Sequence, residues 1–231
     1  MFKNIYFYRA RLFPAVITSI PMLIFFNKIP AVEYNDALKN IYDILPIVAH
    51  LGLSTAVIFL CIQINRLIAK EVFQRMYFKE ELFMPTTTHI MVKSVFYAET
   101  IKNKIRSKIE AAFSVTLLTA REEQQNETNA RKLIATAVSQ IRIALKGNTM
   151  LLQHNIEYGF WRNLIGGSLV AVIFSAAIFF YGYHYGQQDL KAISIICLII
   201  YAIPIFLSKL IINYYGKYYS KILYEQFLSL P

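Results

Sequence analysis

The residues best suited to chemistry in this sequence are basic, hydroxyl-bearing and aromatic side chains in its middle third. The basic ones are Lys102, Lys104, Arg106 and Lys108, and they follow Thr86, Thr87 and Tyr97 in the chain. Cations and hydroxyls bind phosphate oxygens, and an aromatic ring can stack on a base. This set therefore predicts a site for a nucleotide or a short single strand of DNA.

A second interpretation of the basic residues needs no such ligand. Lysine and arginine accumulate in the cytoplasmic loops of membrane proteins, and they attract anionic lipid. The four cations lie far along the chain from the long apolar runs, where membrane topology alone does not require them. Ligand binding and a solvated, lipid-attracting face both remain open at this point.

No pattern typical of an enzyme accompanies the basic residues. The histidines are scattered, without a second ligand at metal-binding spacing: they are His50, His89, His154 and His184. The chain has no glycine loop for phosphates, no G-x-S-x-G and no CxxC. The adjacent pairs Glu80-Glu81 and Glu122-Glu123 point to different sides of a helix. We expect neither catalysis nor a cofactor or metal ion.

The composition is typical of a membrane protein. Of the 231 residues 56% are hydrophobic and only 16% are charged, whereas soluble domains have roughly 25% charged residues. The net charge is nevertheless +10. Cys61 and Cys197 both lie in apolar runs, so we expect them to pack as small hydrophobic side chains rather than to form a disulfide.

Four apolar runs are candidates for crossing a bilayer, which takes about 20 residues of helix. They cover residues of about 12–26, 44–64, 164–181 and 192–212. The first is short and contains Pro14 and Pro21, and the last includes Lys209, which can reach the headgroups. Lysine and arginine are in excess before the first run, between the second and third runs, and after the fourth. Because such an excess marks the cytoplasmic side, both termini and the middle segment are predicted to be cytoplasmic.

A few polar side chains fall inside or beside the predicted second span. They are His50, Ser54 and Gln63. Polar groups in membrane helices either form hydrogen bonds between helices or face a water-filled path. The first role is the commoner one, and the second makes these residues candidates for a pore or gate lining. Gly166-Gly167, at the start of the third span, favours close helix packing over a hinge.

The middle segment, residues 65–163, is predicted to be a basic helical domain. Its first helix continues from the second span to residue 82, and Pro85 ends it. A second helix is expected over residues 95–112. Its apolar stripe would be Ile101, Ile105, Lys108 and Ala112, widened by Ile109.

A third helix is expected to begin at the capping-box sequence from Thr119 to Glu122. Its apolar stripe is Ile134, Ala137, Val138, Ile141 and Leu145. Gly147-Asn148 ends it, and a last helix runs from residue 149 into the third span. The predicted fold is thus an all-α integral membrane protein: a hairpin over residues 1–64, the domain over 65–163, and a second hairpin over 164–231 with a short cytoplasmic tail.

Three short motifs resemble those of a family of small four-span bacterial membrane proteins. They are Arg9-Ala-Arg-Leu-Phe-Pro14, Leu82-Phe-Met-Pro-Thr-Thr-Thr88, and the stretch from Gln153 to Leu164 that contains Tyr158-Gly159-Phe160 and Arg162-Asn163. The sequence is similar to the membrane channel effectors of the Hailong anti-phage system. Trp161 departs from that pattern, because a second basic residue is expected there.

The resemblance implies an oligomeric channel of the bacterial inner membrane that acts in antiviral defence. Its partner would be a nucleotidyltransferase whose short DNA oligomers hold the channel closed until infection opens it and depolarises the cell. The resemblance does not indicate which residues contact DNA, and we add Arg162 to the candidates. A tetramer is our first expectation for the homo-oligomer, since one four-span chain cannot readily enclose a pore.

A different class of function also fits the sequence. The chain could be a non-conducting membrane scaffold or regulatory partner, whose basic loop binds anionic lipid or a soluble protein. A transporter is less well supported, because the sequence shows no inverted repeat and no charge within the spans.

Overall fold

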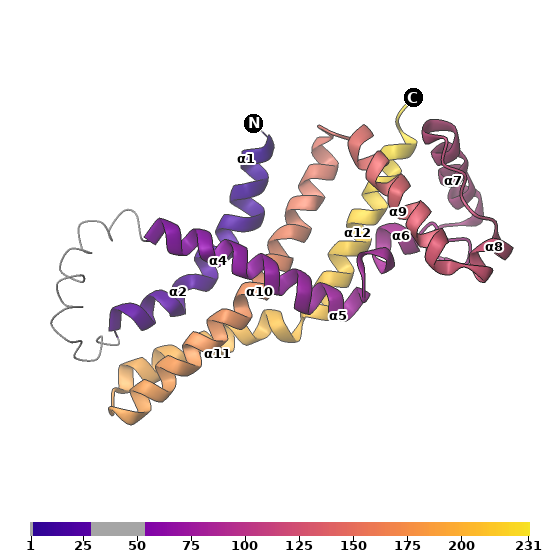
Figure 1. Ribbon diagram of the computed structural model, residues 1–231. Coiled ribbons are helices and arrows are strands. Elements are labelled where there is room, and N and C mark those ends of the chain that lie inside the picture. Colours follow the sequence, from indigo (N-terminus) through magenta and orange to yellow (C-terminus); the bar gives the residue numbers. More distant parts are fainter. Residues whose placement is uncertain (1, 29–53) are drawn as a thin grey trace, which may run out of the picture. The chain divides into compact units, whose positions relative to one another are not determined.

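The computed structural model describes residues 2–28 and 54–231, and every regular element in these two ranges is a helix (Figure 1). The chain divides into two compact units. We call Lys3–Phe73 with Gly159–Lys209 the apolar unit, and Gln74–Tyr158 with Leu210–Pro231 the polar unit. An all-helical chain agrees with the predicted fold class.

Three helices of the described residues are long and apolar enough to cross a membrane. They are Ile5–Phe26, Thr149–His184 and Gln188–Phe206. They correspond to the first, third and fourth predicted spans and indicate an integral membrane protein. Of the second predicted span, only residues 54–64 are described, within α4 (Ser54–Ile68). The four-span arrangement therefore stays a prediction.

The first span is longer than the sequence analysis expected. It joins α1 (Phe2–Phe7), a π-helical turn η1 (Tyr8–Leu12) and α2 (Phe13–Lys28). The N–H of Phe13 donates to the carbonyl oxygen of Tyr8, five residues back. Pro14 follows immediately and cannot donate to a carbonyl four residues back, which explains a widened turn at this point.

The last span is shorter than expected. Helix α11 (Gln188–Phe206) ends at Leu207, and a separate helix α12 (Ser208–Leu228) begins there, so the predicted run to residue 212 is broken. Pro204 lies in the final turn of α11, where a proline commonly weakens or ends a helix. The third span lies in α10 (Thr149–His184), which is continuous with the helix predicted before it.

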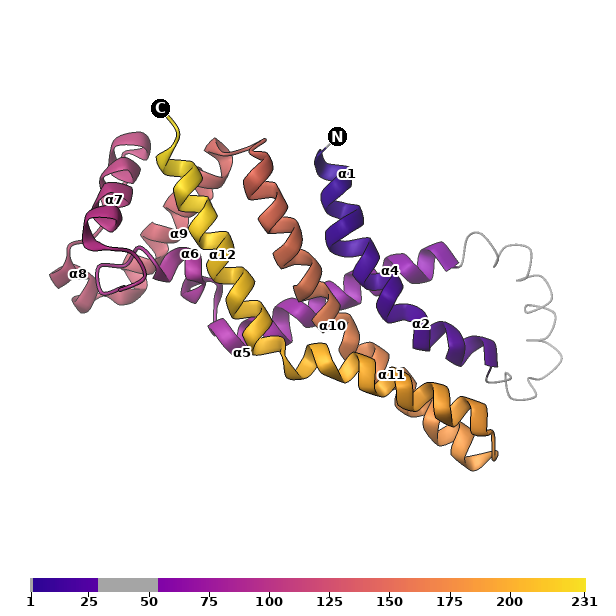
Figure 2. The ribbon, with the colours of Figure 1, turned by 180° about the vertical axis from the view of Figure 1, so that it is seen from behind.

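Small residues bring the helices of the apolar unit close together. Figures 1 and 2 show the end of α10 running antiparallel beside α11. A Cβ added to Gly166 would lie 2.3 Å from the carbonyl oxygen of Asn65, and one added to Gly167 would lie 2.3 Å from Thr18 Oγ1. Helix α10 thus approaches the backbone of α4 and the Thr18 side chain of α2 closely, as the prediction of close packing at these glycines requires.

The first span contains two prolines, and side chains of other helices satisfy the carbonyls that these prolines leave. In a regular α-helix, the nitrogens at positions 14 and 21 would donate to the carbonyls of Ala10 and Ile17. Asn163 Nδ2, on α10, donates to the Ala10 oxygen at 2.6 Å. The Tyr201 hydroxyl, on α11, donates to the Ile17 oxygen at 2.5 Å. These two bonds tie the first helix to both of the others.

The polar unit consists of short helices around one apolar core. Its elements are α5 (Arg75–Phe78), η4 (Glu81–Phe83), α6 (Pro85–Thr88), α7 (Glu99–Phe113), α8 (Ala120–Gln125) and α9 (Glu127–Ala144), with the start of α10 and most of α12. The predicted stripe of α9 is confirmed, because all five of its side chains are buried in this core.

Other predictions for this unit were wrong in detail. The helix predicted over residues 65–82 does continue from α4, through a π-helical turn η3 (Ala69–Gln74) into α5, but it ends at Phe78 before Lys79, whose φ is +59°. The capping box at Thr119 is present, with its backbone N–H 2.8 Å from the Glu122 carboxylate. The helix it opens stops at Asn126, which caps α9 separately.

The apolar stripe of α7 also differs from the prediction. Ile105 and Ile109 are buried, but Ile101 and Ala112 are exposed. The position that we expected Ile101 to fill is taken by Lys102, which is buried. The aliphatic stem of a lysine can line a core where its ammonium reaches acceptors, and that combination is not visible in a hydrophobic pattern.

Helix α12 was missed by the sequence analysis, which treated the residues after 212 as a short tail. It is part of the polar unit, and Figures 1 and 2 show it running past α6 and α9. Ile222, Leu223, Tyr224 and Phe227 are all buried in the core of that unit. The polar unit therefore combines the middle segment with the C-terminal helix and is not only an insertion between two spans.

Candidate anion-binding groove

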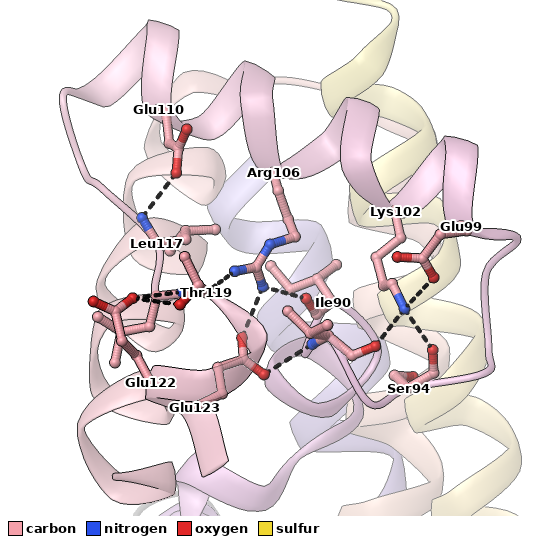
Figure 3. A network of polar contacts seen from close by, with 12 residues as sticks. Ile90, Ser94, Glu99, Lys102, Arg106, Glu110, Leu117, Thr119, Glu122 and Glu123 are labelled. Atoms are coloured by element: carbon pink, nitrogen blue, oxygen red, sulfur yellow. Dashed lines mark hydrogen bonds and ion pairs between the residues drawn. The ribbon is translucent and has the colours of Figure 1, made fainter. Parts of the chain in front are cut away.

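The ammonium of Lys102 forms bonds within the polar unit. Its side chain is 2% exposed, and its Nζ donates to the carbonyl oxygens of Val92 at 2.5 Å and Ser94 at 2.9 Å. The Glu99 carboxylate lies 2.8 Å away. Figure 3 shows this ammonium at the loop that precedes α7. Lys102 thus holds a loop in place, and its three donors have protein acceptors.

Arg106 has a similar internal role one turn later. Its Nη1 donates to the Glu123 carboxylate and to the Ile90 carbonyl, each at 2.9 Å, and its Nη2 donates to the Leu118 carbonyl. The other Glu123 oxygen accepts the backbone N–H of Val92 at 2.9 Å. Arg106 and Glu123 together link α7, α8 and the loop before α7 (Figure 3).

Lys108 and Lys104 complete the predicted basic set on α7. The Lys108 ammonium donates to the carbonyl oxygens of Leu230 and, at 3.4 Å, Leu228, so it binds the C-terminal end of α12. Lys104 is exposed. The structure therefore does not bring the four cations to one surface: three donate to main-chain carbonyls in the unit, and only Lys104 points to solvent.

The remaining predicted ligand residues are dispersed. Thr86 and Thr87 are buried in α6, and the Thr86 carbonyl accepts the hydroxyl of Tyr224. The ring of Tyr97 packs at 6.2 Å from the ring of Tyr224, and its buried hydroxyl has no hydrogen-bond partner among the described residues. Burial raises the pKa of that hydroxyl, and the Glu225 carboxylate adds to the effect. Arg162 belongs to the apolar unit.

The described residues include only part of the predicted pore lining. His50 lies outside the described residues, and Ser54 is described only as the first residue of α4. Gln63 is exposed on α4, with no other pore candidate placed beside it. A pore lining by these residues therefore stays a prediction.

A groove of about 790 Å³ lies along α9 in the polar unit. One wall is a single face of α9: Lys132, Ala135, Thr136, Val138, Ser139 and Arg142. These positions recur at helical spacing and extend over about 15 Å at 1.5 Å per residue. The other wall comes from the segment before and within α6: Glu80, Leu82, Met84, Thr86 and Thr87.

The α9 groove has the chemistry that the sequence analysis sought on α7. Lys132 and Arg142 line it near its two ends, and among the described residues neither forms an ion pair. Thr136 and Ser139 place hydroxyls between them. Glu80 contributes one carboxylate to the opposite wall. Two cations and several hydroxyls around an open groove suit an extended anion that carries more than one charge.

The sequence contains a pattern that could have indicated this groove, namely polar residues beside the apolar stripe of α9. Lys132, Ser139 and Arg142 flank the stripe that correctly predicted the buried face of α9, so they lie at the edge of that face. Thr86 and Thr87 were selected, and they do line the groove. What could not be seen was that α6 packs beside this edge of α9 and supplies the second wall.

The part of the chain that the structure describes contains no group of three or more metal-ligating side chains. Comparison with protein-family models, with curated protein sequences and with solved structures finds no match to this chain.

Proposed function

We propose that this chain is a subunit of a ligand-controlled channel in the bacterial inner membrane, and that an anionic nucleotide or short single-stranded DNA binds its polar unit. In this proposal the protein is an effector of anti-phage defence. The bound ligand, made by a cognate nucleotidyltransferase, keeps the channel closed, and its loss on infection depolarises the cell. The termini and the polar unit are cytoplasmic.

The observation that carries this proposal is the α9 groove. Lys132 and Arg142 are cations without an ion-pair partner among the described residues, whereas Lys102 and Arg106 are bonded internally. The Arg142 guanidinium lies over the Tyr219 ring, 5.7 Å from its centroid, so it has a cation–π contact but no carboxylate partner. Cations without a carboxylate partner that line a groove with hydroxyls are suited to several phosphates of one ligand. The proposed contact residues are thus Lys132, Arg142, Thr136 and Ser139, and Thr86 and Thr87 support the opposite wall.

A continuous helix supports control of the membrane part by the polar unit. Helix α10 contributes its first residues to the polar unit and its remainder to the apolar unit, without a break. A ligand that favours one state of the polar unit can act on the membrane through such a helix. Because one chain has too few spans to enclose a pore, we propose a homo-oligomer, with a tetramer as the first expectation.

Binding of short single-stranded DNA to the full-length protein in detergent tests the groove. In the double variant Lys132→Glu, Arg142→Glu, we expect affinity to fall by about tenfold or more, because each charge-assisted contact contributes roughly 1.5–3 kcal/mol. For the parent, log affinity should fall with log salt at a slope of about −0.7 per phosphate neutralised. Fluorescence anisotropy measures both.

The matched control is Lys104→Glu with Lys146→Glu. Both lysines are exposed and neither lines the groove. The control variant therefore changes the net charge by as much as the groove variant does, but it leaves the groove residues unchanged. Equal binding by the parent and the groove variant, with the control also unchanged, would reject the site.

A non-conducting scaffold or regulatory partner is the second candidate. It is favoured if the purified protein is a monomer in mild detergent and its expression leaves the membrane potential unchanged. The channel proposal predicts an oligomer and a loss of potential when the protein is expressed without its inhibitory ligand.

A further inference from the structure

Helix α12 has one face that the polar unit leaves uncovered, and that face is both apolar and basic. Leu210, Tyr214 and Tyr218 recur four residues apart and are 67%, 52% and 42% exposed. Lys217 and Lys221 are exposed and fall on the same side of the helix by their spacing. We call these five residues the α12 face.

The rest of α12 is occupied by the polar unit. Ile212, Leu223 and Phe227 are almost fully buried, as is Ser220. Tyr218 is supported from the side by the ring of His154, whose centroid lies 5.9 Å away. Tyr214 and Tyr218 contact each other with ring centroids 5.2 Å apart. The α12 face is therefore a fixed surface on a packed helix and not a set of loose side chains.

The composition of the α12 face matches a membrane interface. Tyrosine places an apolar ring below the headgroups with its hydroxyl in the polar layer, and lysine reaches anionic headgroups with its ammonium. Aspartate is absent from the described α12, and the Glu225 carboxylate lies 3.7 Å from Lys221. Each basic residue near an anionic surface adds to the attraction between that surface and the protein.

Helix α12 directly follows a candidate membrane span, and this position indicates lipid as the partner of the α12 face. Helix α12 begins two residues after Phe206, the last residue of a candidate membrane span. We propose that the α12 face binds the headgroups of anionic phospholipids in the leaflet where α11 ends. Within α12, Tyr218 follows Ser208 by about 15 Å of helix at 1.5 Å per residue, whereas the headgroup layer is only about 5–8 Å thick. In this proposal α12 runs along the membrane surface.

This proposal does not depend on the channel or on its ligand. It assigns a surface that is distinct from the α9 groove, since the two share no residue. Through the α12 face, the charge of the lipid acts on the polar unit, which also contains the α9 groove.

The test uses the full-length protein in nanodiscs, with Cys61 and Cys197 replaced by alanine. A bimane label is attached to Tyr218→Cys or, as a control, to Asn103→Cys on an exposed position of α7. In nanodiscs that contain phosphatidylglycerol, nitroxide-bearing lipids should quench the label at 218 at least twofold more than the label at 103. Aqueous iodide should show the reverse order.

Two outcomes would overturn the proposal. Equal quenching at 218 and 103 would make the α12 face a solvated surface. Equal quenching at 218 in phosphatidylcholine and phosphatidylglycerol would remove the role of anionic headgroups. The variant Lys217→Glu, Lys221→Glu, labelled at 218, provides a second measurement: we expect its lipid quenching to fall at least twofold in anionic nanodiscs only.

Discussion

The two units of this protein satisfy main-chain carbonyls in different ways. In the apolar unit the donors are neutral: Asn163 binds the Ala10 carbonyl, Tyr201 binds the Ile17 carbonyl, and Thr18 Oγ1 binds the Pro14 carbonyl at 2.8 Å. In the polar unit cations donate as well, beside neutral donors such as the Tyr224 hydroxyl. Lys102 and Arg106 each bind two main-chain carbonyls of the loops around α7.

The difference follows from the cost of charge in each environment. A cation inside a bilayer is expensive, so a membrane helix with prolines is better served by amide and hydroxyl donors. A buried cation in the polar unit is compensated by a carboxylate, Glu99 for Lys102 and Glu123 for Arg106. A run of basic residues in such a domain therefore indicates internal bonding as readily as a ligand site, and cations without a carboxylate partner are the better candidates for a ligand.

The largest expected effect follows from removing a charged donor. Arg106→Ala leaves the Glu123 carboxylate, which is 5% exposed, without its cation, and leaves two carbonyls without a donor. Breaking a buried pair in this way costs about 3–5 kcal/mol. We expect hydrogen exchange of the α7 and α8 amides in the full-length protein to accelerate strongly.

Lys104→Ala is the matched control for this prediction, because it removes an exposed cation from the same helix. Its effect should stay within about 0.5 kcal/mol. If the α7 and α8 amides were equally protected from hydrogen exchange in Arg106→Ala and Lys104→Ala, the charged donor Arg106 would have no structural role. That result would contradict the difference between the two units described above.

A smaller effect is expected from the neutral donors. Asn163→Leu and Tyr201→Phe each remove one bond to a carbonyl opposite a proline, and hydrogen bonds between membrane helices contribute about 0.6–2 kcal/mol. With Cys197 replaced by alanine, the buried Cys61 thiol reports unfolding of this unit, since a thiol-reactive dye reaches it only when the helices separate. We expect its reaction to begin a few degrees lower in each variant.

Tyr185→Phe is the control, because that hydroxyl is on an exposed residue. An onset temperature in Asn163→Leu and Tyr201→Phe that equals the one in Tyr185→Phe would contradict a structural role of these neutral donors.

The smallest effect at neutral pH concerns His89. Burial lowers the pKa of this histidine to about 4, and Lys217 contributes further. Its ring stacks on Phe96 at 3.6 Å, and its Nδ1 is buried without a partner among the described residues. The unfolded chain takes up a proton near pH 6.5 and the folded one only near pH 4, so stability falls as the pH falls through this window.

The measurement is protection from hydrogen exchange in the polar unit between pH 7 and pH 4, corrected for the intrinsic exchange rate. The variant His89→Gln should lose less protection over this range than the parent. An identical pH dependence in both would mean that His89 is not held neutral by the fold.

The regular parts of the fold could be predicted from the sequence because they depend on local patterns. Apolar side chains recur at helical spacing from Ile134 in α9 to its C-cap Leu145, and Thr119 and Glu122, three residues apart, form a capping box. Helix α12 was missed because glycine and serine (Gly216 and Ser220) interrupt its buried face while tyrosines lie on its exposed face, which weakens the hydrophobic pattern.

The candidate site was harder to predict, because the fate of a cation depends on what folds against it. Lys102 and Lys104 are two residues apart and look equivalent in the sequence, yet one is buried and the other is exposed. Arg106 is internal because Glu123, seventeen residues later, folds onto it. Lys132 and Arg142 have no such partner, and that contrast exists only in three dimensions.

Ion flux from liposomes that contain the purified protein tests the central proposal most directly. We predict that the parent conducts ions, that short single-stranded DNA on the side of the polar unit reduces the flux, and that Lys132→Glu with Arg142→Glu conducts but no longer responds to DNA. The control Lys104→Glu with Lys146→Glu should respond like the parent. Absence of flux from the assembled parent, or equal inhibition of the parent and the groove variant by DNA, would contradict the proposal.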